Sequence, residues 1–168
     1  MKPLLYLLAL CLILPMQALA YDDLTRFDFE NDMNLHQFAI TSTVPQVATG
    51  RCEDCGGTVN FVVMVMPDQN DLADAVRHGE ITLEDLTEGS AACVGDLMCD
   101  GGQIILSRRH AGFITETSTA DFGHSKDAML SDEKTLLNIS VTGDSRALAN
   151  DVFDYFWQLM EPSFGSAE

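Results

Sequence analysis

The chain has 168 residues, with 26 acidic side chains against nine basic ones, and a formal net charge of −17 at pH 7. Phosphate backbones and anionic membrane surfaces repel so acidic a protein, which argues against nucleic acid and anionic lipid as partners. Two uses of the charge remain open, attraction of a basic partner and solubility alone.

The first twenty residues have the pattern of a secretory signal peptide. Lys2 gives a positive start, residues 4–14 form an apolar run, and Ala18-Leu19-Ala20 is a small-x-small cleavage site before Tyr21. The apolar run is shorter than the roughly 20 residues of a membrane-spanning helix, although an uncleaved anchor is the alternative. We therefore expect a soluble product, not an integral membrane protein after cleavage, exported to the periplasm or the extracellular medium.

Removing 20 of the 168 residues leaves 148, which is the size of one ordinary domain over residues 21–168. Its first half predicts three strands, over residues 27–30, 35–44 and 59–66. The third is apolar on both alternating faces, which is typical of a central strand covered on both sides. Residues 45–50 between the second and third strands are predicted to be a connection.

Two main helices are expected, over about residues 68–79 and 145–160. Leu72, Ala73 and Val76 give the first an apolar stripe, and the second has a broader stripe at helical spacing. Residues 103–109, 113–118 and 136–142 are predicted to be strands, and the polar stretch 119–135 a long loop. This order predicts an α+β domain with a mostly antiparallel sheet and both helices packed on one face.

Four cysteines remain in the exported chain: Cys52, Cys55, Cys93 and Cys99. An even number in an oxidising compartment indicates structural disulfides, and four cysteines allow three pairings. Pairs across the two motifs would hold the strands at 59–66 and 103–109 side by side, whereas pairs within each motif would close small loops.

Metal binding and thiol–disulfide exchange are the alternative uses of these cysteines. Cys52-x-x-Cys55-Gly resembles the knuckle of a zinc ribbon, and Cys93 and Cys99 would complete a four-cysteine site, although their spacing departs from that pattern. A redox pair is usually followed by a helix, whereas here a strand is predicted after Cys55. We expect neither a metal nor another cofactor.

Function is expected to lie in the connections, because a sheet holds them rigidly. Asp121, His124 and Lys126 in the predicted loop are the candidate binding residues. His124 and Ser125, with Asp121 or Asp127, could also belong to a small secreted hydrolase, but they match no catalytic motif. The sequence therefore favours a non-enzymatic binding protein whose partner, a protein or a small ligand, it does not identify. The alternatives are a metal or thiol-redox protein using Cys52 and Cys55, and the hydrolase.

Overall fold

A computed structural model describes Leu24 and residues 38–53, 55–69, 71–86, 98–121 and 123–164. The expected strand at 27–30, the start of the next strand, and Cys93 lie outside these residues. In chain order, the elements are β1 (Ala39–Val44), β2 (Val47–Cys52), β3 (Val59–Pro67), α1 (Leu72–Arg77), the short 3-10 turn η2 (Glu84–Leu86), β4 (Met98–Leu106), β5 (Ala111–Thr119), β6 (Gly123–Ser131), β7 (Thr135–Gly143), α2 (Arg146–Met160) and the 3-10 turn η3 (Glu161–Ser163).

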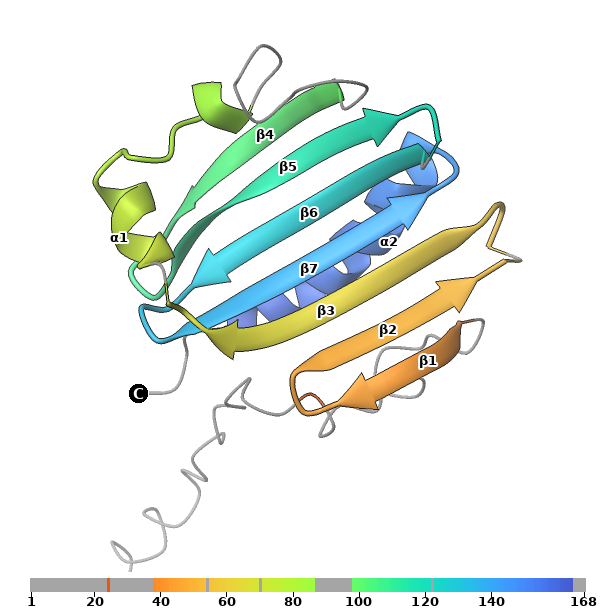
Figure 1. The fold of residues 1–168 in the computed structure, drawn as a ribbon, viewed down its shortest axis with the longest axis horizontal. Helices are drawn as coiled ribbons and strands as arrows, with labels where there is room; N and C mark the ends of the chain where they lie inside the picture. Colours follow the sequence, from red (N-terminus) through yellow and green to blue (C-terminus); the bar gives the residue numbers. More distant parts are fainter. Residues whose placement is uncertain are drawn as a thin grey trace, which may run out of the picture.

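The described strands form one seven-stranded sheet in the order β1-β2-β3-β7-β6-β5-β4, seen face-on in Figure 1. Every neighbouring pair is antiparallel. The expected α+β architecture, an antiparallel sheet with two helices, is confirmed, although the sheet dominates more than the sequence indicated. β3 is internal, as expected, with β2 on one side and β7 on the other.

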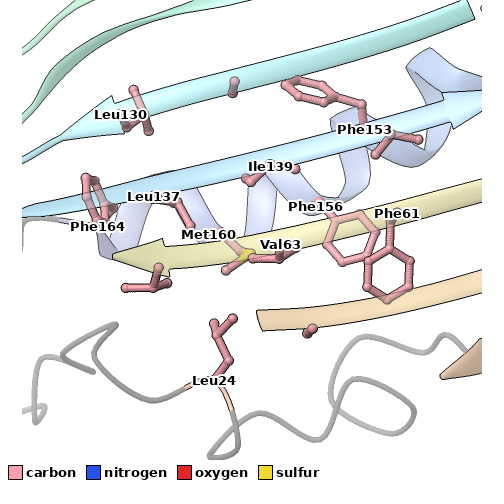
Figure 2. Packing of buried hydrophobic residues seen from close by; sticks show 14 of the residues in the cluster. Leu24, Phe61, Val63, Leu130, Leu137, Ile139, Phe153, Phe156, Met160 and Phe164 are labelled. Carbon is pink, nitrogen blue, oxygen red and sulfur yellow. The ribbon is translucent and has the colours of Figure 1, made fainter. Parts of the chain in front are cut away.

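One face of the sheet packs against α2 and forms the main core. Inward-facing residues of β3 and β7, such as Phe61, Val63 and Ile139, meet the buried helix residues Phe153 and Phe156, as Figure 2 shows. The Phe61 and Phe156 ring centroids are 4.6 Å apart. Alternate residues of a strand share one face, so burying these side chains fixes the register of both strands.

The Phe61 ring also covers the neighbouring strand. Gly50 of β2 pairs with Phe61, and a Cβ at Gly50 would lie only 2.3 Å from a ring atom. The absence of a side chain at Gly50 therefore makes room for the aromatic ring that joins β2, β3 and α2.

The two helices lie on opposite faces of the sheet, so the prediction that both pack on one face is wrong. Leu72 and Val76 of α1 pack with Leu136 in a second cluster, while the adjacent Leu137 belongs to the α2 core. Side chains at consecutive strand positions point to opposite faces, which separates the two clusters. In Figure 1, α2 runs behind the sheet and α1 lies at one end of its front, near β4 and β5.

α1 is shorter than the predicted 68–79, and side chains support the starts of both helices. The Asp68 carboxylate accepts a hydrogen bond from the Leu72 amide at 3.0 Å, and Gly79 follows the helix with φ +73°. At α2, the Ser145 hydroxyl accepts from the Leu148 amide. None of the described helices combines the length and apolar character needed to cross a bilayer.

Two strands were missed in the sequence. β2 occupies most of the stretch predicted to be a connection, and β6 occupies most of the predicted loop at 119–135. Gly50 weakened the strand pattern of β2, although Phe61 supplies its packing. β6 begins Gly-His-Ser-Lys-Asp, a polar run whose partners lie on distant elements and so leave no local strand signal.

Substitution of Gly112 tests the close approach of β5 to β6. A Cβ there would lie 1.9 Å from the Met129 carbonyl oxygen, whereas a Cβ at Gly101 of β4 would meet nothing within 4 Å. We expect Gly112→Ala to lower the free energy of unfolding by roughly 3 kcal/mol, because the backbone of β6 must shift. Gly101→Ala, the matched control, should change it by less than about 0.5 kcal/mol. Equal effects of both substitutions in urea denaturation would contradict this packing.

Candidate functional site

The first cysteine motif closes on itself. Cys52, the last residue of β2, is bonded to Cys55, and the Cys52 side chain is buried in the α2 core. The turn then meets the start of α2, because the Thr58 amide donates to the Asp144 carboxylate at 2.6 Å and the Asp144 amide donates to the Thr58 carbonyl at 3.0 Å. The disulfide therefore stiffens the connection that enters β3 and supports α2.

Cys99 is also disulfide-bonded, and Cys93, the other cysteine of its motif, lies outside the described residues. The structure thus has Cys52, Cys55 and Cys99 in disulfides, as the disulfide interpretation of the cysteines expects. With its sulfurs joined, the Cys52–Cys55 pair offers no thiolate to a metal ion, so a metal site there would require the reduced form. The disulfide does not decide the redox hypothesis, because exchange begins with attack of a partner's thiolate on a disulfide sulfur. Within the described part of the chain, no group of three or more His, Cys, Asp or Glu residues is placed to hold a metal ion.

The three candidate binding residues do not share a surface. Asp121 is exposed in the turn between β5 and β6. His124 and Lys126 stand on β6 opposite Gly143 and Val141, on the face that carries α2. The expected binding loop is wrong as a structural description, because cross-strand hydrogen bonds to β5 and β7 hold this segment as a strand.

Lys126 instead fastens α2 to the sheet. Its Nζ lies 2.9 Å from Asp154 Oδ1 and 3.8 Å from Glu116 Oε1, and 4.8 Å from the centre of the Phe153 ring. The side chain is 14% exposed. A lysine this enclosed needs its carboxylate partners, because burying an unpaired charge is costly.

The two ends of α2 carry further polar contacts. At the first residue, Arg146 Nη2 lies 2.8 Å from Asp100 Oδ2 on β4. Just beyond the last residue, the Glu161 carboxylate lies 2.9 Å from Nε2 of His110, whose ring is buried beside Phe164. These contacts join α2 to β4 and to the β4–β5 turn.

The carboxyl of Asp100 has a lowered pKa. Burial acts to raise this pKa, but hydrogen bonds from Arg146 and Ser118, with the positive charges of Arg146 and His124, outweigh it. The ionised form is therefore the one that suits the fold, and Asp100 acts as the anchor for the start of α2.

The hydrolase residues also fail to converge. His124 and Ser125 are consecutive on β6, so their side chains project from opposite faces of the sheet. Ser125 Oγ donates to Asp127 Oδ2 at 2.8 Å, on the face away from α2. Among the described residues, no imidazole stands on that face beside Ser125 to remove a proton from its hydroxyl.

The face away from α2 is the most distinctive surface of the described structure, and we call it the open face. It comprises the outward side chains of β2, β3, β7, β6 and β5. Alternation along β7 separates the two faces, with Ile139 and Val141 buried and Ser140 and Thr142 partly exposed. In Figure 1, no described helix crosses the front of β2, β3 and β7.

Strand register arranges the open face in three rows across the sheet. The row nearest α1 is mostly apolar: Val47, Met64, Asn138, Met129, Phe113 and Ile104. The middle row holds Thr49, Val62, Ser140, Asp127, Thr115 and Gly102. The third row is polar: Arg51, Asn60, Thr142, Ser125, Thr117 and Cys99. The surface is thus apolar near α1 and rich in hydroxyl groups at its far side, and the Asp127 carboxylate lies at its centre.

This surface was not predicted from the sequence, although one signal pointed to it. Residues 59–66 are apolar on both alternating faces, and the second of those faces, with Val62 and Met64, proves to be half-exposed. Comparison of the chain with protein-family models finds no match, and comparison with curated protein sequences finds no significant similarity.

Asp100→Asn tests the anchoring of α2. Because the folded state lowers the pKa of Asp100, its ionised carboxylate stabilises the fold at neutral pH, and this contribution is lost as the pH falls through the lowered pKa. We expect the variant to be less stable at pH 7 by about 1 kcal/mol or less, with the deficit closing in acid. Asp121→Asn, which removes the same charge from an exposed turn, should show no such deficit. Urea denaturation from pH 7 to pH 2 measures both, and a deficit that grows in acid would contradict the assignment.

Proposed function

We propose that the protein is an exported, disulfide-stabilised interaction protein without catalytic activity, which binds its partner on the open face. The observation that carries the proposal is the apolar content of β3 on that face. Val62, Met64 and Met66 point away from the α2 core, and Met66 is 36% exposed. Apolar side chains gathered on one exposed surface are typical of an interaction site.

The chemistry of the open face also suits binding. Methionines such as Met64 and Met66 adapt their shape to a partner, because the unbranched side chain has several rotatable bonds and a polarisable sulfur. Ser125, Ser140 and Thr142 add hydroxyl donors and acceptors beside them. All of these groups stand on hydrogen-bonded strands, which hold them in place before a partner arrives.

Export is supported by the signal-like residues 1–20 and by the oxidised state of Cys52, Cys55 and Cys99. Disulfides persist in the periplasm and outside the cell and are rare in a reducing cytosol. In such a compartment, the acidic surface would also keep an interaction protein soluble in its free state.

Intact-mass measurement tests the export step. When the full chain is produced in a bacterial host, we expect the exported protein to begin at Tyr21, because cleavage follows Ala18-Leu19-Ala20. Its mass should lie about 4 Da below that of the fully reduced chain, since each of two disulfides removes two hydrogens. A retained N-terminus, or cysteines that react with iodoacetamide without prior reduction, would contradict this part of the proposal.

Methionine-methyl NMR tests binding on the open face. With ¹³C-labelled methionine methyls and a neutral apolar probe, n-hexanol, we expect the Met64 and Met66 signals to shift with added probe. Met160, which is fully buried in the α2 core, serves as the internal reference and should not respond.

Two charge substitutions serve as matched variants in this titration. Met64→Lys should abolish the Met66 response, because it places a charge beside Met66 on the outward side of β3. Leu159→Lys should leave that response intact, because Leu159 is 41% exposed on the outer side of α2. The proposal fails if the open-face methyls do not shift, or if Leu159→Lys and Met64→Lys have the same effect.

A further inference from the structure

Asp127 is a carboxylate in the middle of the open face, on β6 between Thr115 of β5 and Ser140 of β7. Its side chain accepts a hydrogen bond from Ser125 Oγ, and no cation of the described residues pairs with it. Lys126 follows it directly but points to the α2 face, where Asp154 and Glu116 hold it. A carboxylate can accept about four hydrogen bonds, so Asp127 retains acceptor capacity on the side that faces away from the sheet.

The position of Asp127 relative to the apolar row determines which kind of partner can pair with its carboxylate. Residues two apart on a strand are separated by about 7 Å, so Met129 lies one row from Asp127 on the same face. Val62 shares the row of Asp127, two strands away across β7. A complementary partner therefore needs a positive group set among apolar groups at this spacing.

The architecture of the sheet indicates the shape of that partner. The opposite face is already covered by an amphipathic helix, α2, which packs its buried residues Phe153, Phe156 and Met160 on the sheet. On the open face, α1 covers only the end of the sheet near β4, β5 and β6. A second helix beside α1, over β3 and β7, would bury the apolar side chains of this face as α2 buries those of the opposite face.

We propose that the partner is a protein that docks an amphipathic helix on the open face beside α1, with a lysine or arginine of that helix paired to Asp127. The apolar residues of the docked helix would lie on Val62, Met64 and Met66, which alternate along the outward side of β3. This inference rests on the proposed function and adds the secondary structure and charge of the partner. The net charge of −17 supports it, since a strongly acidic protein attracts basic segments and repels acidic ones.

Designed peptides test the inference. We would use an amphipathic helical peptide of about 18 residues, with leucines along one face and one lysine at the centre of that face. Two matched peptides carry norleucine or glutamate in place of the lysine. Affinities for the mature protein are measured by fluorescence anisotropy, and the Met64 methyl signal reports whether the peptide lies on the open face.

The lysine peptide should bind at least about tenfold more tightly than the norleucine peptide, and the glutamate peptide more weakly still, because a charge-assisted contact is made or opposed. Asp127→Asn should remove the lysine preference while leaving affinity for the norleucine peptide unchanged. Asp121→Asn, which changes the net charge equally from an exposed turn, should preserve the preference. Thermal melts of both variants would establish that they remain folded.

Several outcomes would overturn the inference, and they can be told apart from failure of the proposed function. If lysine and norleucine peptides bind equally while the Met64 signal shifts, the open face binds but Asp127 does not select a cation. If octylammonium binds as tightly as the lysine peptide, the helical partner is wrong. If the protein self-associates in sedimentation equilibrium and Asp127→Asn prevents it, the occupant is a second copy. If no peptide binds, the inference fails, and the hexanol titration separately decides whether the open face binds apolar groups.

Discussion

The alternation of side chains along β3 and β7 is the constraint on which the described structure depends. On one face these strands present Phe61, Val63, Ile139 and Val141, which α2 buries with Phe153 and Phe156. Because successive side chains of a strand point to opposite faces, the alternate residues Val62, Met64, Ser140 and Thr142 lie on the other face. The mixed character of the open face therefore follows from the same register that builds the core, and α1 is long enough to cover only one end of it.

Polar residues on the α2 face help to hold the helix on the sheet. Their partners cannot be recognised from the sequence alone, so the same residues were predicted to lie in a binding loop. Lys126 pairs with Asp154 and Glu116, and Arg146 pairs with Asp100; each pair joins residues far apart in the sequence. In the sequence of a single strand, a lysine is expected to face solvent. Here the Lys126 amine lies over the Phe153 ring, and the Asp154 carboxylate of α2 balances its charge. The interaction is therefore visible only once the strands and α2 are brought together.

The sequence predicted the elements whose signals are local. The apolar stripe of α2 lies within a single segment, and β7 could be predicted as a strand from its own residues. Three other features could not be predicted, because each depends on tertiary partners. β2 depends on Phe61 packing over Gly50, and β6 depends on carboxylates of distant elements. The position of α1 depends on the division of Leu136 and Leu137 between two clusters. The open face was missed for a related reason. An apolar second face on β3 suggests a covered strand, and only the assembled sheet shows that the described helices leave it bare.

Oxidative footprinting of the methionines in the mature, unliganded protein tests the central claim most directly. Hydrogen peroxide treatment followed by peptide mass spectrometry gives an oxidation rate for each methionine side chain. We predict that Met64 and Met66 oxidise many times faster than Met160, because Met64 is partly exposed and Met66 is 36% exposed on the open face, whereas Met160 is fully buried beneath α2. Equal protection of Met64 and Met160 would show that the face is covered in the free protein and would contradict the account.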